Sequence, residues 1–176
     1  MRRIQVSKRG GNRWLEVDEC SNAMDYLERV NLFLTEDRDS KWKWVSIALH
    51  GALYGFGVLA IMGTNPYGKP PEGSGVGERT KKGDRLIGFD DVLRRIPVSL
   101  TPEQKRSIRK LQDMLRNNFV HFTPKQHSIG LDGMPQIIEN GVAIIEHLVF
   151  EVPRFRMHEE DREFVRRTID DIRRNL

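Results

Sequence analysis

"WVSIALHGALYGFGVLAIM", residues 44–62, decides the fold, because nineteen consecutive positions carry no acidic residue, lysine or arginine. A helix of this length and apolarity is long enough to cross a bilayer. Ser46, His50, Tyr54 and three glycines dilute the apolar character, and the sequence on either side is polar. We therefore interpret the stretch as most of a buried central helix over residues 41–62 of a soluble bundle, with a membrane anchor as the alternative.

Small residues recur on one side of this helix, at Ala48, Gly51, Ala52 and Gly55. Side chains of this size let a neighbouring helix approach closely. The spacing of Gly51 and Gly55 matches a motif of membrane helix dimers, but close packing inside a soluble bundle needs the same residues. The pattern predicts that another helix packs tightly against this side.

The rest of the chain is also mostly helical by periodicity and by capping residues. Besides the central helix we predict helices over residues 21–34, with Ser21 as the cap, and over 89–96, 102–122, 134–150 and 157–174. "RRIQVSK" and "RWLEV" near the N-terminus allow a short strand or arm. Residues 63–84 hold six glycines and three prolines, which is typical of a long mobile loop. We predict an all-α, up-and-down bundle of five to six helices without a convincing sheet.

A chain of 176 residues has room for one domain with a real core. Within it we distinguish an N-terminal extension with the first helix (1–39), a helical bundle with the flexible insertion 63–84 (40–152), and a C-terminal amphipathic helix (153–176). The single cysteine, Cys20, forms no internal disulfide, and the N-terminus lacks the apolar core of a signal peptide. These features predict a cytoplasmic protein.

The charge permits an anionic partner. The formal net charge is +4, and arginine outnumbers lysine 20 to 9. The planar fork of arginine suits bidentate phosphate contacts, although many of these side chains also serve as solvated helix surface.

Signatures of metal and cofactor sites are missing from the sequence. No HExxH-like spacing, GxSxG elbow or phosphate-binding glycine pattern occurs, so we predict no metal and no cofactor. We expect His50 to be a hydrogen-bonded buried histidine, and His147 and His158 to lie at the surface. The aromatic residues on or beside the central helix are expected in the core rather than in a base-stacking platform: Trp42, Trp44, Tyr54 and Phe56.

"LRNNFVH", residues 115–121, lies near the end of the helix predicted over 102–122. Thr101 as cap, Pro102 in the first turn and Gln104 as the reciprocal partner begin that helix, and Pro124 stops it. On a wheel at about 100° per residue, one stripe forms the core face. The stripe consists of Ile108, Leu111, Leu115, Phe119 and Phe122.

Three polar residues of the motif, Arg116, Asn117 and His121, lie about 100° or more from the centre of that stripe if the helix is straight. Asn117 and His121 are one turn apart, so the amide can orient the imidazole. Val120 is an apolar residue on the outward side, which hints at contact with another chain. The plainer interpretation is that His121 pairs with the helix dipole and the other groups solubilise the surface.

The stretch "LRNNFVH", near the end of a long helix in an all-α chain with an apolar helix and a long insertion before it, resembles the signature of the HEPN superfamily. That signature is an arginine, a polar residue that is commonly asparagine, aspartate or histidine, and then a histidine. Arg116, Asn117 and His121 match it, with four residues between the arginine and the histidine. The resemblance covers roughly residues 40–150.

The resemblance implies a homodimer in which the two motif helices meet in a cleft, and a metal-independent endoribonuclease of toxin or phage-defence type. His121 would act as general base or acid, Arg116 would stabilise charge on the phosphoryl oxygens, and Asn117 would position the histidine or the phosphate. The products would carry 2′,3′-cyclic phosphate ends.

Further expectations concern RNA contacts and partners. The side chains expected to contact the RNA substrate are Arg109, Lys110, Lys125 and His127. An antitoxin or nucleotidyltransferase partner fits small toxin members of the superfamily. The alternative function is a catalytically inactive helical dimer that binds RNA, a nucleotide or a partner protein through the same face.

Overall fold

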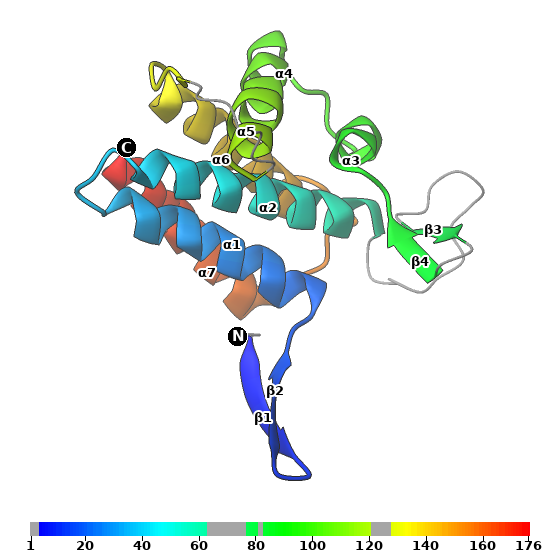
Figure 1. The fold of residues 1–176 in the computed structure, drawn as a ribbon. Helices are drawn as coiled ribbons and strands as arrows, with labels where there is room; N and C mark the ends of the chain where they lie inside the picture. The colour runs from blue at the N-terminus through cyan, green and yellow to red at the C-terminus, as the bar shows by residue number, and fades with distance from the viewer. Residues whose placement is uncertain (1–3, 63–76, 81–82, 121–127) are drawn as a thin grey trace.

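The computed structural model describes residues 4–62, 77–80, 83–120 and 128–176, and it is mostly helical (Figure 1). The elements in chain order are β1 (Gln5–Arg9), β2 (Asn12–Glu16), α1 (Glu19–Leu34), α2 (Lys41–Met62), β3 (Gly77–Thr80), β4 (Gly83–Leu86), α3 (Phe89–Arg95), α4 (Pro102–Arg109), η1 (Lys110–Arg116), α5 (Asn117–Val120), α6 (Met134–Phe150) and α7 (Glu159–Asn175). The all-α character predicted from the sequence is confirmed.

Helix α2 is the central helix, as predicted, and its bounds agree with the predicted range. It packs against α1, α3, η1 and α6, and Leu49, Leu53 and Phe56 are almost completely buried. By length and composition α2 would also pass as a membrane span. However, 56% of its most apolar window is covered by the rest of the molecule, as in the core helix of a soluble protein.

The small-residue side of α2 is covered by α1. A methyl group added at Gly55 would lie 2.7 Å from Cβ and 3.2 Å from Cα of Ala23. A methyl group added at Gly51 would lie 2.7 Å from the ring of Tyr26. The two helices therefore approach each other at a distance that only glycine permits, and the predicted tight helix contact is confirmed.

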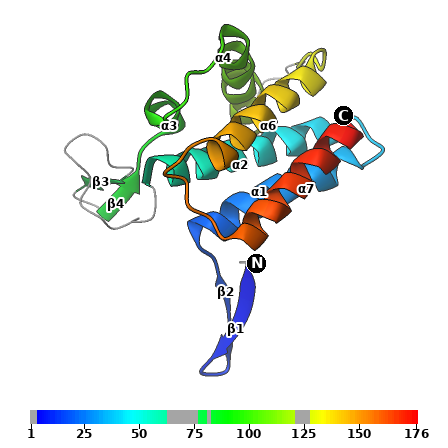
Figure 2. The same ribbon diagram turned by 180° about the vertical axis from the view of Figure 1, so that it is seen from behind.

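Two small antiparallel hairpins correct the expectation of no sheet. Strands β1 and β2 form the N-terminal arm that the sequence allowed, turning through Gly10 and Gly11 at φ of 56° and 83°. Positive φ at both central residues is the geometry of a tight two-residue hairpin turn. This hairpin stands clear of the helices (Figures 1 and 2). Strands β3 and β4 lie in the stretch predicted to be loop, and residues 63–76 of that stretch lie outside the described residues.

Helix caps are set by local hydrogen bonds. Asp18, rather than Ser21, caps α1: its Oδ1 accepts from the Ser21 amide at 2.7 Å, and Ser21 Oγ accepts from the Asp18 amide at 3.0 Å. Ser21 is therefore the reciprocal partner of the cap and lies within the first turn. The start of α4 is as predicted, with Thr101 and Gln104 exchanging the same pair of bonds.

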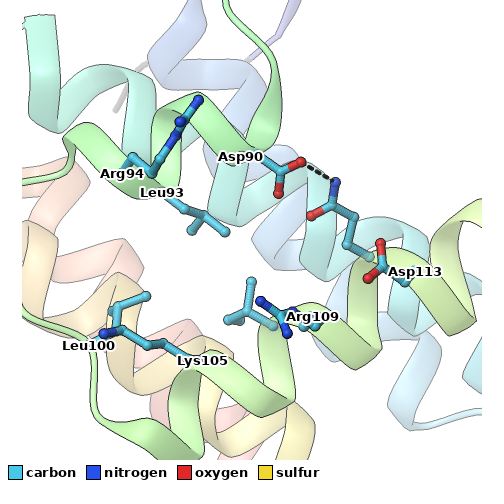
Figure 3. Close-up of a pocket in the computed structure, with 9 residues that line it drawn as sticks. Asp90, Leu93, Arg94, Leu100, Lys105, Arg109 and Asp113 are labelled. Carbon is cyan, nitrogen blue, oxygen red and sulfur yellow. Dashed lines mark hydrogen bonds between the residues drawn. The ribbon is translucent and has the colours of Figure 1, made fainter.

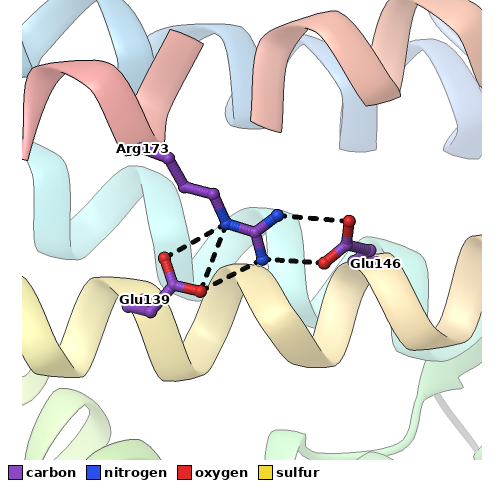
Figure 4. Close-up of polar contacts among 3 residues, drawn as sticks. All are labelled: Glu139, Glu146 and Arg173. Atoms are coloured by element: carbon purple, nitrogen blue, oxygen red, sulfur yellow. Dashed lines mark hydrogen bonds and ion pairs between the residues drawn. The ribbon is translucent and has the colours of Figure 1, made fainter. Parts of the chain in front are cut away.

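One arginine links the C-terminal helix to α6 (Figure 4). Arg173 donates to Glu139 Oε1 at 3.0 Å and to Glu146 Oε2 at 2.7 Å. Hydrogen bonds to these two carboxylates raise the pKa of Arg173, so the guanidinium stays charged. Because α7 also buries Val165, Ile169 and Ile172, this network orients a helix that apolar packing already holds.

The close contact between α1 and α2 predicts different outcomes for two glycine substitutions. Alanine at Gly55 meets the Ala23 backbone, which cannot move aside, and overpacking of this kind costs about 1–3 kcal/mol. Alanine at Gly51 meets only the ring of Tyr26, which is 36% exposed and can turn away. We expect Gly55→Ala to lower the free energy of unfolding in urea, and Gly51→Ala to lower it less. Equal stability of the two variants would show that the helices are not locked here.

Candidate functional site

The helix that carries the motif is not a regular α-helix. Between α4 and α5 the chain forms the π-helix η1, which takes up seven residues. A π-helix closes i to i+5 hydrogen bonds, so each residue turns by less than the 100° of an α-helix. π-Helices are rare and are found frequently at functional sites. The predicted core stripe nevertheless holds on the described residues, because Ile108, Leu111 and Leu115 are buried and Phe119 packs against the core.

Arg116 is the last residue of this π-helix. Its side chain is half-buried, and η1 packs against the central helix α2. Its positive charge acts on His50 of α2, so the two groups are within electrostatic reach of each other. Arg116 is not among the buried core residues, which agrees with the wheel, and its side chain is half-buried rather than fully exposed.

Asn117 holds the arginine in place. Arg116 Nη1 donates to Asn117 Oδ1 at 3.0 Å, and the bond is partly shielded from solvent. Asn117 itself is half-buried at the start of α5. His121, the third residue of the motif, lies outside the described residues, so the orientation of His121 by Asn117 stays a prediction.

His50 is the residue that sequence reasoning assigned to packing and that the structure brings to the motif. Its ring lies on that of Phe89, with centroids 4.1 Å apart and a tilt of 33°. Burial, followed by the positive charge of Arg116, lowers the pKa of His50 to about 4, and the nearby Asp90 opposes this shift. His50 is therefore neutral at pH 7, with a ring nitrogen able to accept a proton. A lone histidine within an apolar helix was the available sequence signal.

Asp90, whose charge acts on His50, joins α3 to η1 through Gln112. Asp90 lies in the first turn of α3, and its Oδ2 accepts from Gln112 Nε2 of η1 at 3.3 Å. The Arg116 site, as we call it, consists of Arg116, Asn117, His50, Asp90 and Gln112, and it draws on α2, α3, η1 and α5. A guanidinium held by Asn117 can bind a phosphoryl group.

The remaining residues that were predicted to contact RNA do not lie together. Arg109 is exposed and lines a pocket between α3 and α4 (Figure 3). Lys110 is half-buried, and its Nζ donates to the Asp132 carbonyl oxygen at 3.0 Å, so it fixes the chain before α6. Lys125 and His127 lie outside the described residues.

Other candidate side chains fall mostly as expected. His147 and His158 are exposed, and Trp42, Tyr54 and Phe56 pack in or against the core. Trp44 is the exception, because 42% of its surface is exposed, with the ammonium group of Lys43 over its ring at 4.7 Å. Its position on the outer side of α2 corrects the expectation that it belongs to the core.

No protein-family model, curated protein or solved structure matches this chain. Among the described residues, no group of three or more His, Cys, Asp or Glu side chains is placed to hold a metal ion. The site is therefore interpreted from its own geometry and from the motif.

The link between Arg116 and His50 predicts a titration. In a proton NMR titration, the His50 ring should change its shift near pH 4 in the wild type. Arg116→Ala should raise the pKa of His50 only part of the way towards 6.5, because burial is the larger cause. Arg109→Ala, which removes an exposed arginine outside the Arg116 site, should leave it unchanged. A wild-type His50 that titrates near 6.5 would contradict the burial of its ring within reach of the Arg116 charge.

The same lowered pKa predicts how stability depends on pH. Unfolded His50 binds a proton near pH 6.5 and folded His50 near 4, so protonation favours the unfolded chain in between. The stabilising effect of neutral His50 on the free energy of unfolding is intact above pH 6.5. As the pH falls to 4, this effect is lost, by up to about 3 kcal/mol. His50→Gln should flatten the pH dependence of the urea midpoint in this window, whereas His147→Gln should leave the slope as it is.

Proposed function

We propose that the protein is a metal-independent endoribonuclease that cleaves RNA at a homodimer cleft, with Arg116, Asn117 and His121 as catalytic residues. His121 takes the proton of the ribose 2′-hydroxyl or donates one to the leaving oxygen. Arg116 stabilises the charge that grows on the phosphoryl oxygens. The attacking group belongs to the RNA, so cleavage leaves a 2′,3′-cyclic phosphate and a 5′-hydroxyl.

One observation carries the proposal: Arg116 is half-buried, hydrogen-bonded to Asn117 and close enough for its charge to lower the pKa of His50. An arginine that only solubilised a helix would extend into water. Holding it partly buried next to an imidazole disfavours the protonated imidazole, and arrangements of this kind are found preferentially at functional sites. The resemblance of the motif to the HEPN superfamily, stated from the sequence, points to the same chemistry.

Support for a dimer comes from Val120, which is 45% exposed at the end of the motif helix. An apolar residue beside charged catalytic groups fits a face that meets a second copy. In the proposal the two motif helices meet there, the protein acts in the cytoplasm, and an antitoxin or a nucleotidyltransferase controls it in a toxin or phage-defence setting.

The proposal predicts cleavage of single-stranded RNA in EDTA by the purified protein. His121→Ala and Arg116→Ala should each reduce the rate by at least about a hundredfold, the lower end of the effect of a general acid–base group or a charge-stabilising donor. His147→Ala and Arg106→Ala remove exposed side chains and should retain full activity. The 2′,3′-cyclic ends should be identified by mass spectrometry of the fragments.

A second measurement addresses the dimer and the alternative function. Sedimentation of wild type and His121→Ala at micromolar concentration should give a dimer in both cases. A wild type that binds RNA without cutting it would support the inactive binding dimer, and cleavage that survives in His121→Ala would refute the assigned role.

A further inference from the structure

A second feature adjoins the Arg116 site. A pocket of about 550 Å³ opens between α3, the segment that follows it, α4 and η1 (Figure 3). Its apolar wall is made by Leu93, Leu100 and Ile108. Lys105 and Arg109, one turn apart on α4, bring two positive charges to the side facing Leu93. The volume lies within the range of small-ligand sites, about 300–1,000 Å³.

The pocket is continuous with the Arg116 site through shared residues. Asp90 and Gln112 line the pocket, and the hydrogen bond between them joins α3 to η1. Asp90 also acts on His50, and Gln112 lies four residues before Arg116 on η1. Arg116 itself does not line the pocket, so a molecule that reached both would extend from the pocket past Gln112 to the end of η1.

The lining matches the two halves of a nucleotide. A base has two apolar faces, which fit the wall of Leu93, Leu100 and Ile108, and its phosphate is anionic, which fits Lys105 and Arg109. Asp113 is exposed on η1 and also lines the pocket. A carboxylate accepts hydrogen bonds and repels other acceptors, so it favours the edge of a base that carries an amino group.

We propose that this pocket binds the nucleotide next to the cleaved phosphodiester of single-stranded RNA and prefers guanine, adenine or cytosine over uracil through Asp113. The inference rests on the proposed function for its role in RNA cleavage, but the binding itself does not depend on it. Lys105 and Arg109 hold a phosphate, and the apolar wall holds the base. The preference follows because uracil has no exocyclic amino group to donate to a carboxylate.

The test is the binding of free nucleoside 5′-monophosphates, which contain no phosphodiester to cleave. Isothermal titration in EDTA with GMP, AMP, CMP and UMP should give weaker binding for UMP. The Lys105→Ala/Arg109→Ala double variant should weaken all four by at least about tenfold, the loss expected for charge-assisted hydrogen bonds. Arg106→Ala removes an exposed arginine of the same helix that does not line the pocket, so it is the matched control.

The Asp113→Asn variant tests the preference of the pocket against uracil. The amide keeps the shape of the carboxylate but loses its charge and gains donors, so UMP should bind about as well as the other three nucleotides. Circular dichroism melts will show that each variant is folded, as expected for exposed positions. The inference is overturned if none of the four nucleotides binds at millimolar concentration, or if the double variant binds them as the wild type does.

The outcomes separate the pocket from the catalytic proposal. Nucleotide binding that requires Lys105 and Arg109, in a protein that cuts no RNA, would support the pocket and refute the ribonuclease. Cleavage that requires His121, in a protein that binds no nucleotide in the pocket, would support the ribonuclease and refute the pocket. Binding to the Arg116→Ala variant with wild-type affinity would place the nucleotide in the pocket rather than at the catalytic arginine.

Discussion

The close packing of three helices on α2 is the constraint on which the rest of the structure depends. Helix α1 meets α2 at Gly55 and α3 meets it at Gly57, where an added methyl group would lie 2.7 Å from Ala23 and 2.5 Å from Val92. Helix α6 brings Gly141 against Leu49, which a methyl group there would approach to 2.9 Å. Contacts this short fix the rotation of α2 about its axis and its position along that axis. The position of every side chain on α2, His50 included, is set by them.

The π-helix η1 connects the motif to this fixed helix, because η1 packs against α2 and ends at Arg116. Close-packed interiors exclude a half-buried guanidinium unless polar groups compensate it, because a desolvated charge is costly. Asn117 supplies an oxygen to Arg116, and Asp90 supplies a negative charge to the same region. Arg116 is the last residue of η1, and Asn117 follows it directly. π-Helices are rare and occur frequently at functional sites, so the position of η1 agrees with the proposed role of this segment.

Sequence reasoning succeeded where local physics decides. The capping box at Thr101, the bounds of α2 and the tight contact at Gly55 follow from neighbouring residues and apolar length. It failed where tertiary contacts decide. The wheel found the core stripe of the motif helix, but no periodicity in the sequence reveals its π-helix. His50 and Asp90 are 40 residues apart in sequence, so their meeting depends on the packing of α3 on α2, which no local pattern contains.

The electrostatics of the site make it sensitive to an anionic ligand. In the free protein the charge of Arg116 disfavours a protonated His50, second only to burial. A phosphate bound by Arg116 would cancel most of that charge and add a negative one nearby, and both changes favour the protonated imidazole. His50 would then become a stronger base when substrate is present than when the site is open to water. In the proposed function, a phosphate bound at Arg116 would therefore raise the pKa of His50.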